Sequence, residues 1–376
     1  MTAKIFRFLD DVRPATPCVV VDLDVVRENY LNLRHWLPLA QVYYAVKANP
    51  APEIVSLLVG LGSNFDVASR PEIELCLNAG ATADRISFGN TIKKKSDIAF
   101  AYDKGVRLFA FDSEAELDKL AEAAPGARVF CRILMTCEGA EWPLSRKFGC
   151  EIDMARDLLV AARDRGLEPY GVSFHVGSQQ TDLAQWDVAV GKTAMLFTAL
   201  NEAGIQLKMV NLGGGLPARY RTDVPSLDRY ADAMMHAMTK HFGNDLPAMI
   251  IEPGRGLVGD AGILETEVVL ISRKSYGEDV RWVYLDVGKF GGLAETMDES
   301  IKYRIETGHD GEQTGPVILA GPTCDSADIL YEKAGYQMPL SLAVGDRVRI
   351  LTTGAYTTSY SAVNFNGFEP LKAYFV

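Results

Sequence analysis

The chain has 376 residues, of which 48% are hydrophobic and 23% are charged. This is the balance of a globular protein, and the length allows a large core and two domains. The 49 acidic residues outnumber the 38 lysines and arginines, and the formal charge of −11 argues against partners such as nucleic acid or an anionic membrane.

The six cysteines are scattered, with neither a CxxC pair nor the spacing of a metal site. This pattern predicts reduced thiols, no bound metal and a cytoplasmic protein. The stretch from Met1 to Val12 has too short an apolar run for a signal peptide. No stretch of the sequence approaches a transmembrane span.

Apolar, β-rich runs alternate with helical patterns between residues 24 and 257. The predicted strand cores are residues 42–46, 64–67, 86–88, 108–111, 129–133, 171–176, 209–212 and 249–251. This many β/α alternations predict a (β/α)₈ barrel of the TIM type rather than an open doubly wound sheet.

The rest of the chain has a different pattern of predicted secondary structure. Residues 258–376 contain short strands separated by turns, without a matching number of helical patterns. The strand near Val19 has no place in the barrel, so we expect residues 1–23 and 258–376 to form a separate β domain.

Polar or glycine residues end every predicted barrel strand. They are Lys47, Asp66, Asn90, Asp112, Arg132, His175, Gly213 to Gly215, and Glu252 with Arg255. Active sites of such barrels lie at the carboxyl ends of the strands. These residues are therefore the candidates for an active site.

Lys47 ends a buried strand, where its amine must be desolvated, paired or covalently occupied unless it reaches water. Gly213 to Gly215 let backbone N–H groups approach a phosphate, although three glycines also suit a tight turn. The guanidinium of Arg255 suits phosphate, and Glu252 needs a cationic partner such as a pyridinium nitrogen. Together these features predict pyridoxal phosphate bound covalently by Lys47. His175 could stack on the ring, although a lone strand histidine is more often structural.

The motifs also carry a resemblance. They are residues 44–49 (YAVKAN), 65–69 (FDVAS), 175–179 (HVGSQ), 213–215 (GGG), 252–255 (EPGR), 321–325 (GPTCD) and 354–356 (GAY). In this order they resemble the fold-type III pyridoxal-phosphate decarboxylases, which act on ornithine, lysine and diaminopimelate and share their barrel with alanine racemase. Within that family the chain is most similar to bacterial ornithine decarboxylases, some of which also take lysine.

The resemblance implies roles around the cofactor. Lys47 would be the Schiff-base lysine, His175 the ring-stacking residue and Glu252 the partner of the pyridine nitrogen. The phosphate would be held by Ser178, Gly214, Gly215, Arg255 and Tyr356. Asp66, Glu72 and Arg132 match positions near the cofactor.

The resemblance also implies a homodimer with shared active sites. Cys324 would protonate the product carbanion and Asp325 would bind the distal amine, both at the partner subunit's cofactor. Lys147 and Asp328 match a pair that bridges the subunits. The far end of the substrate pocket would be lined by Glu295, Asp298 and Glu299, of which we expect two to be a solvated helix face. Phe290 stands where eukaryotic ornithine decarboxylases have a tyrosine, so a hydroxyl contact is missing there.

These residues predict decarboxylation of ornithine to putrescine in polyamine biosynthesis, with lysine to cadaverine as the poorer reaction. Glu252 keeps the pyridine nitrogen protonated, whereas the racemases have an arginine at that position. Diaminopimelate decarboxylase is the alternative, but it would need an arginine that residues 288–295 lack. A non-catalytic regulatory homologue is the remote alternative, since such proteins lose cofactor or acid residues that this chain retains.

Overall fold

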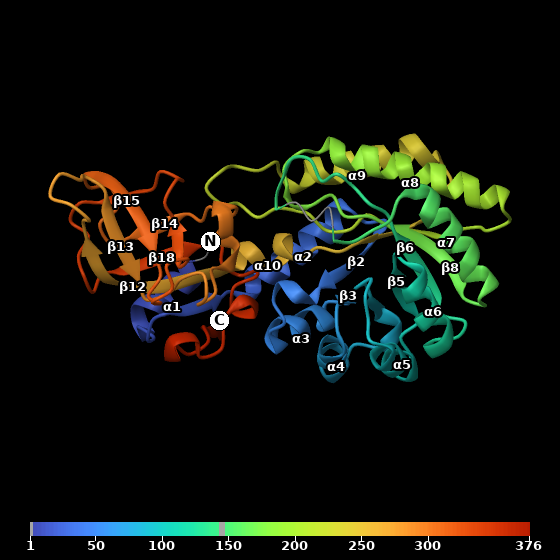
Figure 1. The fold of residues 1–376 in the computed structure, drawn as a ribbon, viewed down its shortest axis with the longest axis horizontal. Coiled ribbons are helices and arrows are strands. Elements are labelled where there is room, and N and C mark those ends of the chain that lie inside the picture. The colour runs from blue at the N-terminus through green and yellow to red at the C-terminus, as the bar shows by residue number, and fades with distance from the viewer. Residues whose placement is uncertain (1–2, 143–146) are drawn as a thin grey trace. The chain divides into compact units, whose positions relative to one another are not determined.

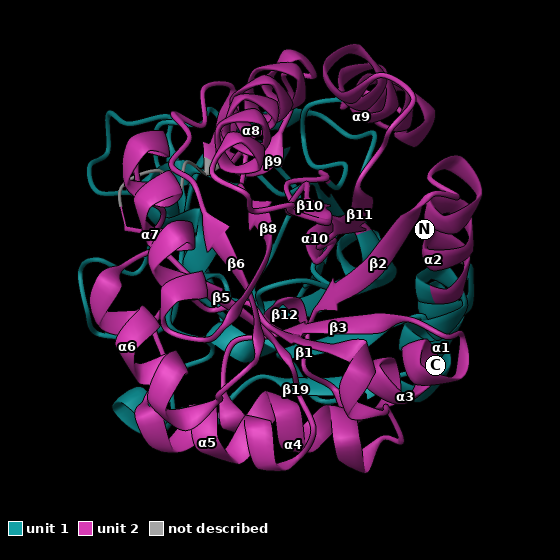
Figure 2. Cartoon of the chain, turned by 90° about the vertical axis from the view of Figure 1, so that its right-hand side faces the viewer, with its two compact units in different colours: residues 1–26, 218–223, 257–376 teal, residues 27–217, 224–256 magenta. Residues whose placement is uncertain are grey.

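The computed structural model describes residues 3–142 and 147–376 (Figure 1). The chain divides into two compact units, coloured separately in Figure 2. The barrel unit comprises residues 27–217 and 224–256, and the β unit comprises residues 1–26, 218–223 and 257–376. The predicted domains are residues 24–257 for the barrel and residues 1–23 with 258–376 for the β domain. That these segments fold as independent domains remains a prediction.

The barrel unit contains a closed parallel barrel, as predicted. In the order in which they pair, its strands are β10 (Met209–Asn211), β11 (Ala248–Ile251), β2 (Ala40–Ala45), β3 (Asn64–Val67), β4 (Ile86–Phe88), β5 (Leu108–Phe111), β6 (Arg128–Arg132) and β8 (Glu168–Ser173). Helices surround these strands in Figure 2. These helices are α2 (Leu23–Trp36), α3 (Pro52–Gly60), α4 (Arg70–Asn78), α5 (Lys95–Asp103), α6 (Glu114–Ala123), α7 (Ile152–Asp164), α8 (Ala184–Glu202) and α9 (Leu227–Phe242). The short helix α10 (Arg255–Val258) follows β11.

Apolar side chains fill the interior of the barrel. Residues from five strands form one buried cluster of Tyr43, Leu108, Ala110, Phe130, Met209 and Ile250, with Tyr170 packed against it. Side chains from strands around a closed barrel can meet only inside it, so the barrel is a packed core and not a pore. The packed interior therefore holds the polar residues at the carboxyl ends of the strands in fixed positions.

Some strand limits and one strand pair of the barrel unit differ from the sequence prediction. Strand β2 ends at Ala45, and Lys47 lies in a short 3₁₀ turn, η1 (Val46–Ala48), because the chain turns one residue earlier than its apolar run suggests. A small antiparallel pair, β7 (Ala140–Trp142) with β9 (Ser178–Gln180), was not predicted. Strands of three residues carry too little periodicity to be recognised from sequence.

The β unit is built on a nine-stranded sheet. Its strands are β1 (Cys18–Val21), β12 (Gly262–Ser272), β13 (Arg281–Leu285), β14 (Ile305–Thr307), β15 (Thr314–Ala320), β16 (Ile329–Tyr331), β17 (Gln337–Pro339), β18 (Arg347–Leu351) and β19 (Lys372–Phe375). Strand β1 pairs antiparallel with β12 and parallel with β19, so the prediction that the N-terminal strand joins this sheet is confirmed.

Helix α1 (Ala3–Val12) also belongs to the β unit and was not predicted. It buries Ile5 and Leu9 against Cys18, Val20 and Ile263. Two apolar residues four apart are a weak signal in a sequence, and packing on the sheet decides that this segment is helical.

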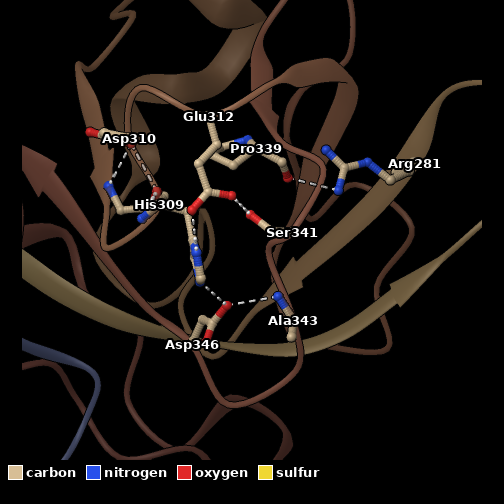
Figure 3. A network of polar contacts seen from close by, with 9 residues as sticks. Arg281, His309, Asp310, Glu312, Pro339, Ser341, Ala343 and Asp346 are labelled. Carbon is tan, nitrogen blue, oxygen red and sulfur yellow. Dashed lines mark hydrogen bonds and ion pairs between the residues drawn. The ribbon is translucent and has the colours of Figure 1, made fainter.

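A polar network connects the turns of the β unit beyond β14 (Figure 3). His309 lies between two carboxylates, with Nδ1 3.3 Å from Glu312 Oε1 and Nε2 3.1 Å from Asp346 Oδ2. Asp346 also accepts a hydrogen bond from the backbone N–H of Ala343 at 2.7 Å. Within residues 3–142 and 147–376, no helix is long and apolar enough to cross a membrane.

Candidate active site

A cavity of about 170 Å³ lies among the carboxyl ends of the barrel strands. Six residues predicted from the sequence line it: Lys47, Asp66, Asn90, Arg132, His175 and Glu252. Each lies at or just after the end of a strand, and the carboxyl ends of parallel strands meet at one rim of a barrel. The other lining residues are Ala68, Gly89, Phe130, Phe148, Ser173 and Phe174.

The amine of Lys47 stands at the wall of this cavity. Its neighbours Val46 and Ala48 are buried, whereas Lys47 itself is exposed. The turn is joined to the end of β11 by a hydrogen bond of 3.0 Å from the Ala45 N–H to the Pro253 carbonyl. The fold thus presents a lysine amine on a fixed turn, accessible to a small molecule.

Two carboxyl groups, the buried Asp66 and the half-buried Glu72, interact electrostatically with Lys47. Burial, followed by the charge of Glu252, raises the pKa of Asp66 well above its ordinary value. Within the described residues, Asp66 Oδ1 is buried without a hydrogen-bond partner. Burial also raises the pKa of Glu72, whose Oε2 accepts a hydrogen bond of 2.6 Å from the Ala68 N–H. A buried oxygen without a protein partner is available to a donor on a bound molecule.

Asn211, at the end of β10, orients Glu252. Its side-chain amide donates to Glu252 Oε1, and its Oδ1 accepts a hydrogen bond of 2.9 Å from the Gly213 N–H. Asn211 was not among the predicted site residues, although an asparagine that ends a strand two residues before a glycine run is a signal visible in the sequence. These two hydrogen bonds fix the orientation of the Glu252 carboxylate beside the glycine run.

His175 is held as a neutral imidazole. Burial lowers its pKa well below the ordinary value, and the charges of Arg132 and Lys47 act in the same direction. Nδ1 accepts a hydrogen bond of 2.9 Å from the Gly177 N–H, so the ring proton resides on Nε2. A neutral ring can lie against a protonated pyridine without charge repulsion.

The glycine run has no room for side chains. Gly213 has a φ of 68°, and a Cβ built on it would lie 2.2 Å from the Phe174 carbonyl oxygen. A Cβ on Gly214 would lie 2.6 Å from the Glu252 carbonyl oxygen, and one on Gly215 2.6 Å from that of Gly177. Only glycine permits this close backbone packing.

An anion-binding group lies on the next strand's loop in the barrel unit. Arg255 is 3% exposed, and its Nε and Nη2 donate to Ser178 Oγ at 3.3 and 3.1 Å. A buried guanidinium, a hydroxyl and a glycine-rich turn form a donor set for phosphate. With Lys47, the His175 imidazole and the unpartnered Asp66 oxygen at the cavity, the residues present fit pyridoxal phosphate.

Comparison with known proteins supports this assignment. Residues 23–259 match the model of the pyridoxal-dependent decarboxylase, pyridoxal binding domain. The chain is 40% identical over 358 residues to the lysine/ornithine decarboxylase of Selenomonas ruminantium, covering 95% of this chain and 88% of the relative. The chain belongs to the pyridoxal-dependent decarboxylases.

Solved structures agree with this family. The lysine decarboxylase of S. ruminantium, in complex with PLP and cadaverine, aligns with a TM-score of 0.88 and 37% identity over 100% of this chain and 94% of that one. The lysine/ornithine decarboxylase of Vibrio vulnificus with cadaverine aligns with a TM-score of 0.88 and 30% identity over 100% and 99%. The resemblance seen in the motifs is confirmed, and the cofactor of this decarboxylase is pyridoxal phosphate.

Several other predicted site residues of the decarboxylase lie in the β unit. Cys324 and Asp325 are exposed on the loop after β15, where the Cys324 N–H donates to Asn366 Oδ1 at 3.1 Å. Tyr356 is half-buried, with its ring centroid 5.7 Å from that of Tyr360. The roles predicted for these residues at the cofactor remain predictions.

The three carboxylates predicted at the far end of the substrate pocket differ from one another. Glu295 is buried, and Glu299 Oε1 accepts hydrogen bonds from the Glu332 and Lys333 N–H groups at 2.7 and 2.6 Å. Asp298 is exposed. Two of the three, Asp298 and Glu299, keep exposed surface as expected, but the segment that carries them is a kinked 3₁₀ turn and not a regular helix.

Phe290 and Asp328 also have partners within the β unit. The Phe290 ring packs 5.0 Å from that of Phe365, and both line a second cavity of about 220 Å³. Asp328 is buried and accepts hydrogen bonds from the Lys289 N–H at 2.8 Å and the Thr323 hydroxyl at 2.7 Å. The predicted bridge from Lys147 to a partner's Asp328 stays a prediction. In the described part of the chain, no group of three His, Cys, Asp or Glu residues could hold a metal.

Proposed function

We propose that this decarboxylase converts L-ornithine to putrescine and carbon dioxide in polyamine biosynthesis, with L-lysine to cadaverine as a slower reaction. The observation that carries the proposal is the meeting of Lys47, Glu252 and the unpartnered Asp66 oxygen at one cavity. The choice of substrate is supported by the similarity to relatives named for both lysine and ornithine.

Different residues would bind different parts of the cofactor. Lys47 would bind it covalently, His175 would stack on its ring, and Ser178, Gly214, Gly215 and Arg255 would bind its phosphate together with Tyr356. Bound pyridoxal phosphate supplies an electron sink for the electrons left behind when carbon dioxide departs. Glu252, oriented by Asn211, would keep the ring nitrogen protonated and so keep that sink effective.

The distal ammonium of the substrate must be desolvated, which is costly unless it meets a carboxylate. Asp325 and Asp298 are the two exposed carboxylates among the four predicted to bind substrate. We assign the ammonium to Asp325, with Asp298 as a secondary contact. Lysine is one methylene longer than ornithine, a difference of about 1–3 kcal/mol in a pocket of fixed shape, so lysine would be a poorer substrate and would not be excluded.

Cys324 would donate its thiol proton to the carbon that has lost carbon dioxide. We propose that Cys324 and Asp325 serve the partner subunit's cavity in a homodimer, supported by their exposure on the β unit. We also propose that the enzyme works in the cytoplasm, because its six cysteines are free thiols, as in proteins of reducing compartments.

One experiment tests the substrate. Carbon dioxide release is measured from ornithine, lysine, arginine and diaminopimelate under the same conditions. Ornithine should be fastest and lysine slower, and diaminopimelate should be among the poorest because its distal carboxylate would face Asp325. Faster release from diaminopimelate than from ornithine would overturn the proposal.

A variant pair tests the ammonium site. Asp325→Ala should lower kcat/KM for ornithine by on the order of 10²-fold, because the ammonium loses its carboxylate, while the affinity for the cofactor changes little. Asp298→Ala should have a smaller effect on the same ratio. Unchanged ornithine kinetics in Asp325→Ala would remove this residue from the substrate site.

A further inference from the structure

Three consecutive lysines, Lys93 to Lys95, lead into helix α5, of which Lys95 is the first residue. The side chain of Lys93 has no exposed surface, whereas that of Lys95 is 57% exposed and pairs with Glu122 on the surface. A fully buried lysine is rare and costly to desolvate unless it is paired. Lys93 has no place in the cofactor chemistry described above, so its burial calls for another explanation.

The Lys93 ammonium joins three elements of the barrel unit. It donates to the Asn90 carbonyl after β4 at 2.7 Å and to the Ala110 carbonyl in β5 at 2.6 Å. It also forms an ion pair of 3.0 Å with Glu116 Oε1 on α6. The two carbonyls accept two of the three N–H groups of the ammonium, and Glu116 supplies the opposite charge.

The segment held by Lys93 forms part of the cavity wall. We refer to residues 89–92 as the β4 loop; its Gly89 and Asn90 line the cavity. Asn90 Nδ2 donates to the Ala68 carbonyl at 3.3 Å, which joins the β4 loop to the end of β3. A Cβ added to Gly89 would lie only 1.9 Å from Asp66 Oδ1, so this loop packs directly against the Asp66 carboxyl group.

We propose that Lys93 is a positioning residue whose buried ammonium fixes the β4 loop against Asp66 and thereby sets the shape of the cofactor cavity. The proposal rests on the proposed function only for what the cavity binds. Lys93 does not line the cavity, and it acts through Gly89 and Asn90. Without the ammonium, two buried carbonyls lose a donor and Glu116 loses one of its cationic partners, so the loop is free to shift.

The charge on Lys93 gives the proposal a pH signature. Burial lowers the pKa of Lys93 to about 8, opposed by Glu116 and Asp112 and assisted by Lys119. The ammonium is therefore present at neutral pH and is lost above about pH 8. Because the folded pKa lies below that of the unfolded chain, this deprotonation stabilises the fold as the pH rises. A loss of cofactor affinity in that range is then not a loss of folding.

The test compares Lys93→Met with Lys95→Met, its exposed neighbour. Cofactor affinity is measured by absorbance titration and turnover by carbon dioxide release from ornithine. Lys93→Met should lower kcat/KM by on the order of 10²-fold, the size of a small misplacement of catalytic groups, and should weaken cofactor binding. Lys95→Met should resemble the wild type. Wild-type affinity and turnover in Lys93→Met would overturn the proposal.

A second variant is available if Lys93→Met does not fold. Glu116→Gln keeps an acceptor for Lys93 and removes the negative charge that raises its pKa, so cofactor affinity should begin to fall at a lower pH than in the wild type. Lys95→Met should leave that pH unchanged. An identical pH profile in Glu116→Gln and wild type would contradict the proposal. Absence of cofactor binding in the wild type would instead contradict the proposed function.

Discussion

The barrel unit and the β unit present their predicted site residues in different ways. In the barrel unit, Lys47, Asp66, Arg132, His175 and Glu252 converge on one cavity, and burial shifts the pKa values of Asp66, Arg132 and His175. In the β unit, the predicted acid and substrate residues Cys324 and Asp325 are exposed on a loop.

This difference indicates what each unit contributes. A cofactor with several charged groups needs fixed, desolvated partners, which strand ends supply. A proton donor and an ammonium ligand can instead arrive on an exposed loop that meets a second chain. The first three of the following experiments test these roles of the two units, and the fourth tests the stability of the β unit alone.

The largest effect is expected at Lys47. Lys47→Ala should lower turnover at least about 10³-fold, because catalytic groups that act as a unit fail together when one is removed. The variant should also lose the visible absorbance of the covalently held cofactor. The exposed Lys208→Ala serves as the control and should keep both properties. Wild-type turnover in Lys47→Ala without added amine would refute the assignment.

Glu252→Gln should slow decarboxylation by about 10²-fold, the usual size of losing one key electrostatic group. The amide keeps an oxygen for the Asn211 donor, so the fold is preserved, but it cannot keep a pyridine nitrogen protonated. The measurement is single-turnover carbon dioxide release at saturating cofactor, with exposed Glu74→Gln as the control. An unchanged rate with the cofactor bound would mean that Glu252 is not the nitrogen partner.

Mixing inactive Lys47→Ala with inactive Cys324→Ala subunits should restore activity. In a two-fold dimer with shared sites, random exchange gives one intact site in each mixed dimer, or about one quarter of wild-type activity. The measurement is turnover after exchange, with exchange itself followed by differently tagged subunits. Complete exchange without recovery would show that Cys324 serves the cavity of its own chain.

The smallest effect concerns the network in Figure 3. Hydrogen bonding to Glu312, and the nearby charge of Asp346, raise the pKa of His309 above its ordinary 6.5. A raised folded pKa stabilises the fold fully below that ordinary value, and this contribution is lost as the pH rises through the raised pKa. His309→Gln should therefore lower the thermal unfolding midpoint at acid pH more than at pH 8.

His236→Gln, which replaces an exposed histidine of the barrel unit, is the control for that measurement. It should change the midpoint by the same small amount at both pH values. A deficit in His309→Gln that does not depend on pH would show that the charge on His309 does not stabilise the β unit.

The sequence by itself determined the alternation of strands and helices and the polar residues at the strand ends. Hydrophobic periodicity is a local property, and a barrel places every strand's carboxyl end at one rim. Lys47, Glu252 and the glycine run could therefore be recognised as candidates together. The N-terminal strand was assigned to the β sheet for the related reason that the barrel has no position for it.

Only the tertiary structure decided which polar residues are buried and what they contact. Lys93 and Lys95 are indistinguishable in the sequence, yet one is enclosed between two strand ends and a helix while the other faces water. The hydrogen bonds that join Asn211 to Glu252 and Gly213 likewise depend on the fold, although the position of Asn211 before the glycine run is visible in the sequence. Burial and hydrogen bonding depend on segments that are distant in the chain, so local patterns cannot determine them.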